Sequence, residues 1–149
     1  MKPYYSKDGI EIYHGDCREV LPTFSSRQFD AVVTDPPWNR GYFADDDKPW
    51  DQYADWLSEM IASFETVSTD QLVFQSSLAI PYVSHLFVGF TPIAVCKNFS
   101  QMAASEMTVP NAWDIAFIRF REKNYSGGSR NWFIANTAGM LSERSQHPT

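Results

Sequence analysis

Two patterns of hydrophobic and polar positions alternate along the chain. Short apolar runs rich in β-branched and aromatic residues predict strands over residues 9–14, 29–34, 71–75, 92–99 and 113–120. Apolar positions three and four residues apart predict an amphipathic helix over residues 53–64, and shorter segments predict helices over 17–21 and 80–88. Residues 39–51 follow neither period and predict a flexible loop. This order of strands and helices predicts an α/β fold, with the last two strands as an antiparallel edge.

The strand over residues 29–34 carries the clearest signal. Its centre, Ala31 to Val33, is a continuous apolar run, which is typical of a parallel strand buried on both faces. The strand stops at Asp35, and Asp16 likewise follows the strand predicted over 9–14. Ligands of open α/β sheets bind beyond the carboxyl ends of the strands. We therefore expect both carboxylates at one rim of the sheet, which is the candidate site.

Composition limits what this site serves. The chain has 149 residues, 44% of them hydrophobic and 15% aromatic, which predicts one domain over residues 1–149 with its own core. The formal net charge of −6 excludes a surface that attracts polyanions everywhere, so any contact with nucleic acid must be local. One basic cluster could contact phosphates, or could equally be a solvated turn: Arg119, Arg121, Lys123 and Arg130.

The remaining polar features predict neither metal nor membrane chemistry. Cys17 and Cys96 lie outside any zinc-binding spacing and are interpreted as buried, reduced thiols. The acidic run at residues 45–47 is interpreted as solvated surface rather than as a metal site. The N-terminus has no apolar signal segment, and prolines and polar residues interrupt the apolar stretch at 78–96. We expect a cytoplasmic protein.

The tetrad Asp35-Pro36-Pro37-Trp38 indicates a specific chemistry. Two prolines remove backbone N–H donors and leave carbonyl acceptors beside a carboxylate and a flat indole ring. Such a site suits a planar exocyclic amine, whose two N–H groups the Asp35 carboxylate and the Pro36 carbonyl could accept while Trp38 stacks on the ring. An amine held in this way is positioned to receive a methyl group from a sulfonium.

With its surroundings, the tetrad resembles the amino-methylating DNA methyltransferases. Residues 12–17 and 19–22 resemble the segment before the catalytic motif in the permuted class, where that motif precedes the cofactor loop. Residues 131–133 and 144–149 resemble the stretch that leads into the cofactor half. The resemblance implies a Rossmann-like methyltransferase fold, S-adenosylmethionine as cofactor, DNA as partner and a restriction–modification setting. Aspartate as the first tetrad residue implies methylation of adenine N6 rather than cytosine N4.

The resemblance also implies roles for individual residues. Asp35, Pro36, Pro37 and Trp38 would be catalytic and base-binding residues, and the cofactor-binding residues would be Asp16, His147, Pro148 and Thr149. A cap on the helix that begins near Cys17 is an equally good use of Asp16.

The chain departs from the family by ending before the cofactor loop, so we expect an incomplete fold. The absent strand would expose an apolar edge beside residues 29–34, and a second chain or self-association that completes the sheet is expected there. Two alternatives stay open. The chain could be a non-catalytic remnant or interaction subunit of a split methyltransferase, which cofactor binding would test. It could also be an RNA adenine N6 methyltransferase, which competition between DNA and RNA oligonucleotides would test.

Overall fold

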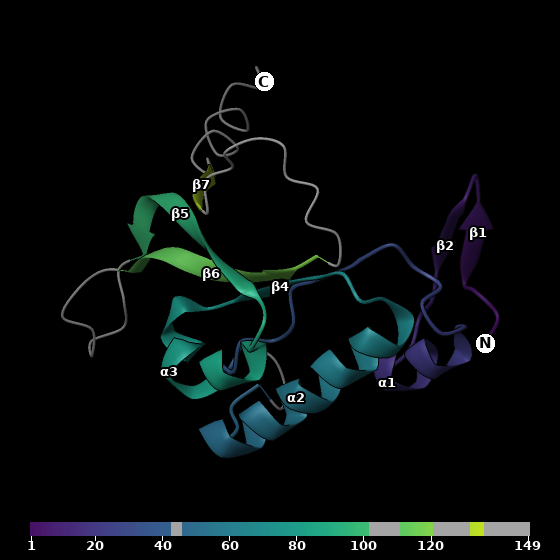
Figure 1. The fold of residues 1–149 in the computed structure, drawn as a ribbon, viewed down its shortest axis with the longest axis horizontal. Coiled ribbons are helices and arrows are strands. Elements are labelled where there is room, and N and C mark those ends of the chain that lie inside the picture. The colour runs from purple at the N-terminus through teal and green to yellow at the C-terminus, as the bar shows by residue number, and fades with distance from the viewer. Residues whose placement is uncertain (43–45, 102–110, 121–131, 136–149) are drawn as a thin grey trace, which may run out of the picture.

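The main sheet of the protein is mixed. The computed structural model describes residues 1–42, 46–101, 111–120 and 132–135. Within these ranges a five-stranded sheet has the order β3-β4-β6-β5-β7 (Figure 1). Its strands are β3 (Val32–Thr34), β4 (Gln71–Gln75), β5 (Thr91–Gln101), β6 (Asn111–Arg119) and β7 (Trp132–Ala135). β3 is parallel to β4 and β7 to β5, whereas β6 is antiparallel to both of its neighbours. The predicted α/β class is confirmed.

The last two predicted strands do pair antiparallel, with Val95 opposite Asp114. They do not form the edge, because β6 lies between β4 and β5 and the unpredicted β7 lies outside them. Their long pairing explains why both strands extend beyond the predicted ranges.

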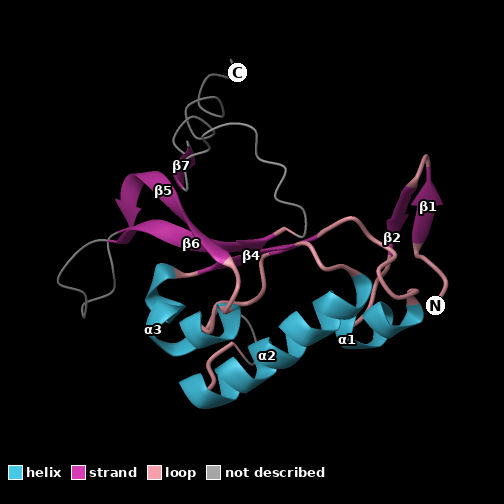
Figure 2. Ribbon diagram, viewed as in Figure 1, coloured by secondary structure: helices cyan, strands magenta, loops and turns pink. Residues whose placement is uncertain are grey.

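The helices lie on one face of this sheet (Figures 1 and 2). α2 (Trp50–Val67) buries residues at helical spacing, among them Leu57 and Ile61, against Val73 and Phe117 of the sheet. This confirms the helix predicted over 53–64, which begins earlier and ends later. α3 (Ile80–Val83) is much shorter than the helix predicted over 80–88. The backbone leaves helical geometry at Val83, whose φ is −119°, and continues as a 3-10 turn over Ser84–Phe87.

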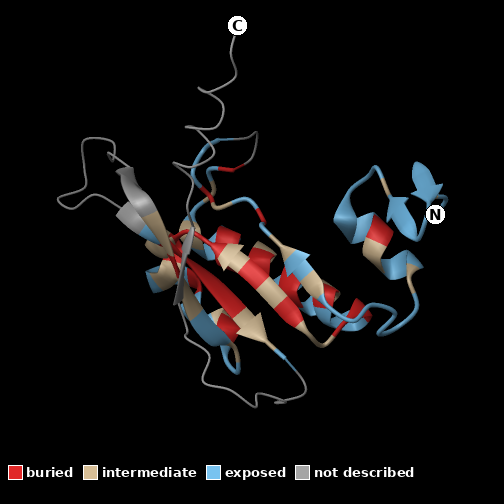
Figure 3. Ribbon diagram, turned by 90° about the horizontal axis from the view of Figure 1, so that it is seen from above, coloured by how far each residue is buried: buried red, intermediate tan, exposed pale blue. Residues whose placement is uncertain are grey.

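The N-terminal hairpin is separate from the main sheet. β1 (Tyr5–Lys7) and β2 (Ile10–Ile12) pair only with each other, around a turn in which Asp8 and Gly9 have positive φ. The prediction that the strand over 9–14 shares a rim with Asp35 is therefore wrong. The Asp8-Gly9 turn directs this strand back onto β1 rather than into the sheet. Figure 3 shows that the hairpin, near the N-terminus, is exposed, while buried residues gather in the sheet and helices.

β3 lies at one edge of the main sheet. Among the described residues its only strand neighbour is β4. None of its three residues is buried, so the prediction of burial on both faces is wrong. Val33 is in register with Leu72, whose side chain alternates with the helix-facing Val73, so Val33 points to the face opposite the helices. It is 67% exposed, and Phe29 just before the strand is 41% exposed. The expected apolar edge is present.

Candidate active site

The tetrad surrounds a hollow at the carboxyl end of β3. The hollow has a volume of about 340 Å³ and is lined by Asp35, Pro36, Pro37, Trp38, Tyr42 and Asp46. A ligand pocket typically has a volume of roughly 300–1,000 Å³, so one planar base fits its scale. The rim placement predicted for Asp35 is the observed one, because β3 ends immediately before it.

Asp35 is an anion without a cation beside it. No lysine or arginine in the described ranges forms an ion pair with it. Partial burial raises the pKa of its carboxyl, and the negative charge of Asp114 raises it further. The Trp38 indole N–H lowers the pKa, by more than Asp114 raises it. This indole nitrogen is buried, and its contact falls short of ordinary hydrogen-bond geometry in the described structure. The carboxylate is thus available to an external donor.

A buried hydroxyl holds the second proline of the tetrad. The Tyr53 hydroxyl, on α2, donates to the Pro37 carbonyl at 2.7 Å and lies 3.1 Å from the Gln75 amide oxygen at the end of β4. Burial raises the pKa of Tyr53 to about 12, so the hydroxyl keeps its proton. One hydroxyl proton serves one acceptor, and turning the Gln75 amide would let it donate to Tyr53 instead. The Pro37 carbonyl is thus engaged within the protein, which favours the Pro36 carbonyl as the acceptor for a substrate amine.

Residues 39–42 are tied by hydrogen bonds to Asp46, contrary to the prediction that this loop is flexible and that Asp46 belongs to a solvated acidic run. Asp46 is 4% exposed, and its carboxylate accepts the backbone N–H groups of Asn39 at 2.6 Å, Tyr42 at 3.2 Å and Arg40 at 3.3 Å. The Asn39 side chain in turn exchanges two hydrogen bonds with the backbone of Lys48, at 2.8 and 2.7 Å. Backbone donors around the carboxylate explain its burial.

A buried ion pair lies at the same rim. Lys97 and Asp114 form an ion pair of 2.5 Å, with side chains 12% and 8% exposed. The two residues are far apart in sequence, and only the antiparallel pairing of β5 with β6 brings them together. No local spacing signals such a pair. Oδ1 of Asp114 has no hydrogen-bond partner in the described structure, which leaves its negative charge partly uncompensated beside Asp35.

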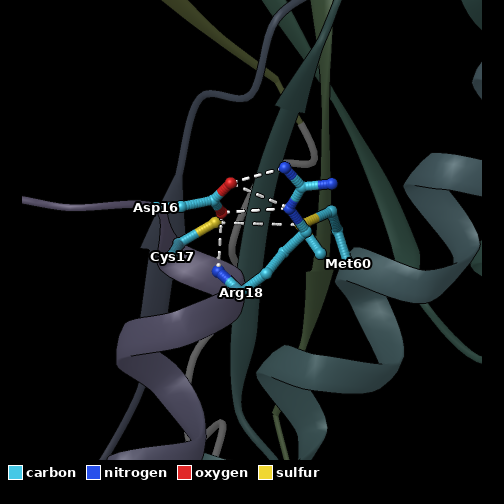
Figure 4. Close-up of polar contacts among 4 residues, drawn as sticks. All are labelled: Asp16, Cys17, Arg18 and Met60. Atoms are coloured by element: carbon cyan, nitrogen blue, oxygen red, sulfur yellow. Dashed lines mark hydrogen bonds and ion pairs between the residues drawn. The ribbon is translucent and has the colours of Figure 1, made fainter.

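Asp16 is engaged within its own turn rather than in the hollow (Figure 4). It caps α1 (Cys17–Val20) by accepting the Arg18 N–H at 2.9 Å, and the Arg18 guanidinium contacts both carboxylate oxygens. These contacts lower the pKa of Asp16 to about 2. The four contacts use the four acceptor positions of a carboxylate, so a cofactor contact would require Arg18 to turn away.

The cysteine interpretation is wrong for Cys17. This residue is exposed, with its Sγ 3.8 Å from the Met60 sulfur, because α1 lies at the surface beside α2 (Figure 4). Cys96 is half-buried.

Arg119, the one member of the predicted basic cluster that the structure describes, does not line the hollow. Arg119 is in register with Gln71, at the start of β4, whereas Asp35 follows Thr34, which is in register with Val73 further along β4. Its side chain reaches Glu65 at 3.4 Å, the Thr69 carbonyl at 3.2 Å and the face of the Phe90 ring at 4.6 Å. The other predicted phosphate contacts and the last three predicted cofactor contacts fall outside the described residues: Arg121, Lys123, Arg130, His147, Pro148 and Thr149.

Across the described ranges, no three His, Cys, Asp or Glu side chains gather as ligands for a metal ion. None of the helices in those ranges combines the length and the apolar character that crossing a bilayer requires.

Comparison with known proteins gives matches in sequence and in fold, although no family model matches. A segment of 55 residues is 36% identical to the type II methyltransferase M.ScaI of Streptomyces caespitosus, and covers 37% of this chain and 18% of that enzyme. A segment of 51 residues is 37% identical to the type II methyltransferase M.BglII of Bacillus subtilis, and covers 34% of this chain and 14% of that enzyme.

Solved structures extend the likeness to most of the chain. The cytosine-N4-specific PvuII DNA methyltransferase superposes with a TM-score of 0.67 at 15% identity, over 90% of this chain and 60% of that one. M1.HpyAVI, in complex with S-adenosylmethionine, superposes with a TM-score of 0.51 at 19% identity, over 82% of this chain and 64% of that one. The chain therefore spans less than two thirds of these proteins. Its resemblance to amino-methylating DNA methyltransferases is confirmed, and its fold is an incomplete α/β methyltransferase fold.

Proposed function

We propose that residues 1–149 are the N-terminal, catalytic-motif half of a cytoplasmic methyltransferase. The enzyme would use S-adenosylmethionine to methylate adenine N6 in DNA. The observation that carries this proposal is the tetrad hollow, where the Asp35 carboxylate has no cationic partner among the described residues and faces a ligand-sized space beside the Trp38 indole. The likeness to type II methyltransferases supports DNA as the substrate and restriction–modification as the setting.

The chain's residues would hold the amine rather than deprotonate it first. Asp35 accepts one N–H and the Pro36 carbonyl accepts the other, which draws the nitrogen lone pair out of conjugation with the ring. S-adenosylmethionine supplies a methyl group on a positively charged sulfur. When bound, it would give this methyl group to the amine nitrogen and keep the electron pair of the broken carbon–sulfur bond, and the proton released by the nitrogen would leave to water. Tyr53 keeps Pro37, and with it the turn, in place during this step.

Cytosine N4 is the second candidate target, because the PvuII enzyme, whose fold matches best among those compared above, is cytosine-N4-specific. Cytosine also presents an exocyclic amine beside a ring nitrogen, so the same acceptors would serve it. Asp35 in the first tetrad position supports adenine, by resemblance to the adenine-specific enzymes.

Cofactor binding would need more than the described residues. M1.HpyAVI was solved with S-adenosylmethionine, which supports the same cofactor here. Of the four contacts that the resemblance assigns, the structure describes only Asp16, whose acceptors Arg18 fills. We therefore assign Asp16 a cofactor contact only in a form in which Arg18 has turned away, and expect most of the cofactor site to come from further polypeptide.

The open edge supports a partner for β3. Val33 and Phe29 are exposed there, and no second strand pairs with β3 in the described ranges. Either a second chain or another copy would complete the sheet, and the same edge favours the alternative of a non-catalytic interaction subunit. Light scattering combined with calorimetric titration of S-adenosylmethionine tests this. We expect cofactor binding only in an assembly larger than one chain, and tight binding by a monomer would contradict the expectation.

The function itself is tested by the methylated nucleosides that the assembly produces. Unmethylated genomic DNA contains every sequence context, so an unknown recognition site is no obstacle. After incubation with S-adenosylmethionine, the DNA is digested and analysed by mass spectrometry, with matched RNA in a parallel reaction. We expect N6-methyladenine in DNA. N4-methylcytosine alone would reassign the target, N6-methyladenine in RNA alone would reassign the nucleic acid, and no methylated product would favour the interaction subunit.

A further inference from the structure

The backbone N–H groups of residues 39–42, directly after the tetrad, form a concave cup that Asp46 occupies. Asn39 and Gly41 have φ values of +58° and +71°, which turn successive N–H groups toward one side of the chain. Three of these groups point at the carboxylate of Asp46, and the Gly41 N–H donates to the Asp46 carbonyl at 2.5 Å. Concave sets of N–H groups of this kind bind anions, and here the anion is the chain's own side chain.

This arrangement decides where Tyr42 lies. Tyr42 follows the cup directly, its N–H is one of the donors to Asp46, and its side chain lines the same hollow as Asp35 and Trp38. The residue is 71% exposed, so core packing does not hold it there. Its position depends on the backbone hydrogen bonds to Asp46.

We infer that Tyr42 is an aromatic wall of the base pocket and that Asp46 is the positioning residue that sets it there. The inference rests on the proposed function, because it concerns the same pocket and the same planar base. A base held at its amine by Asp35 needs contact on its ring faces, and an exposed tyrosine beside Trp38 offers a second flat surface. Aromatic stacking on a base is insensitive to which base it is, so Tyr42 would contribute affinity while Asp35 selects the amine.

The cup can be tested without catalysis by amide hydrogen exchange. We expect the N–H groups of residues 39–42 to be protected in the wild-type chain and to exchange faster in Asp46→Asn, which replaces one acceptor oxygen with a donor. Asp47→Asn is the matched control, because Asp47 is the adjacent aspartate and is exposed. Equal exchange in all three proteins would overturn the role of Asp46.

Base binding is measured by NMR, from the changes in backbone amide chemical shifts during titration with deoxyadenosine. Tyr42→Ala should weaken binding roughly 5- to 100-fold, the range for one base–aromatic stack, while Tyr42→Phe should keep wild-type affinity. Tyr4→Ala is the control, because Tyr4 is an exposed tyrosine outside the hollow. Adding Asp46→Asn to Tyr42→Ala should cost no further affinity, because Asp46 acts through Tyr42. An additive loss would mean that Asp46 only stabilises the fold, and would overturn its positioning role.

Asp35→Asn separates this inference from the proposed function. If Asp35→Asn weakens binding and Tyr42→Ala does not, the aromatic wall is wrong and the amine-binding function stands. If Tyr42→Ala weakens binding and Asp35→Asn does not, the hollow binds bases but the proposed role of Asp35 fails. If the wild-type chain shows no shifts up to the solubility limit of deoxyadenosine, both are overturned.

Discussion

Asp16 and Asp35 occupy similar places in the sequence, but their carboxylates have opposite environments in the structure. Each comes after a strand in the chain, Asp16 directly before helix α1 and Asp35 directly before two prolines. Arg18 occupies the acceptors of Asp16 and lowers its pKa to about 2, whereas burial and Asp114 raise the pKa of Asp35. A carboxylate whose acceptors are used within its own turn is structural. A carboxylate without an ion-pair partner in the described structure is available to a ligand.

The residues that follow each aspartate explain the difference. Asp16 is followed by Cys17 and Arg18, which supply a backbone N–H for helix capping and a guanidinium for an ion pair. Asp35 is followed by two prolines, which have no N–H to give. The local sequence therefore satisfies the first carboxylate and deprives the second of the same contacts.

The largest expected effect comes from removing the charge of the unpartnered carboxylate. Asp35→Asn should lower the initial rate of methyl transfer by the assembled enzyme roughly 100-fold or more, because an amide is a weaker and singly oriented acceptor for the amine. The rate is read as methylated nucleoside formed per unit time. Asp30→Asn, at an exposed aspartate before β3, should keep the wild-type rate. A near-normal rate for Asp35→Asn would contradict the assignment of Asp35 as the acceptor of the substrate amine.

The second-largest effect should come from removing the hydrogen bond between Tyr53 and the Pro37 carbonyl of the tetrad. Tyr53→Phe removes the hydroxyl that satisfies the Pro37 carbonyl and leaves the Gln75 amide without its partner. The free energy of unfolding should fall by about 1–3 kcal/mol, the cost of a buried polar group left unpaired. Urea unfolding measures it. Tyr82→Phe, at an exposed tyrosine stacked on Trp50, should be neutral, and equal stability for both variants would contradict the support role.

A smaller effect should appear in the titration of Asp35. Asp114→Asn removes the negative charge that raises the pKa of Asp35 and leaves the cation of Lys97 uncompensated, and both changes favour the carboxylate. The pKa of Asp35 should therefore fall. Because only the ionised form accepts both lone-pair contacts, the acid limb of activity should move to lower pH. Carboxyl-carbon NMR shifts measure the pKa directly, with Asp55→Asn as an exposed control; no change in the pKa would contradict the coupling.

The smallest effect should come from Asp16, whose carboxylate already accepts hydrogen bonds from Arg18. Asp16→Asn loses the charge but keeps a good capping residue, so the thermal midpoint near neutral pH should move less than in Tyr53→Phe. The lowered pKa means that Asp16 contributes stability above its unfolded pKa and loses it as pH falls toward about 2. The Asn variant should therefore unfold less steeply with acid over that window. An Asn variant as acid-sensitive as wild type would show that Arg18 contributes nothing.

Local patterns predict the elements whose structure is decided locally. The helical spacing of apolar residues predicts α2, and the run at 71–75 predicts β4 with its observed bounds. The sequence also predicts the tetrad at the carboxyl end of β3. Tertiary pairing decides the rest. The strand over 9–14 pairs with β1 instead of the main sheet, and the Lys97–Asp114 pair exists only through the register of β5 with β6.

Within the site, too, local sequence patterns do not predict contacts that depend on tertiary structure. Residues 45–47 are identical aspartates, so nothing in the sequence distinguishes Asp46, which only the positive φ values of the preceding loop make an acceptor. Tyr53 belongs to the predicted apolar face of α2, and its hydroxyl has a role only because Pro37 and Gln75 meet above it. A buried tyrosine at the start of a core helix is the one signal that could have indicated such a contact.

The most direct test of the contrast between the two aspartates is one pH titration of the wild-type chain, with the carboxyl carbons of Asp16 and Asp35 followed by NMR. We predict a pKa of about 2 for Asp16 and a pKa above the ordinary aspartate range for Asp35. Equal values, or a lowered pKa for Asp35, would mean that Asp35 is already satisfied within the chain. The tetrad would then have no free carboxylate to offer an amine.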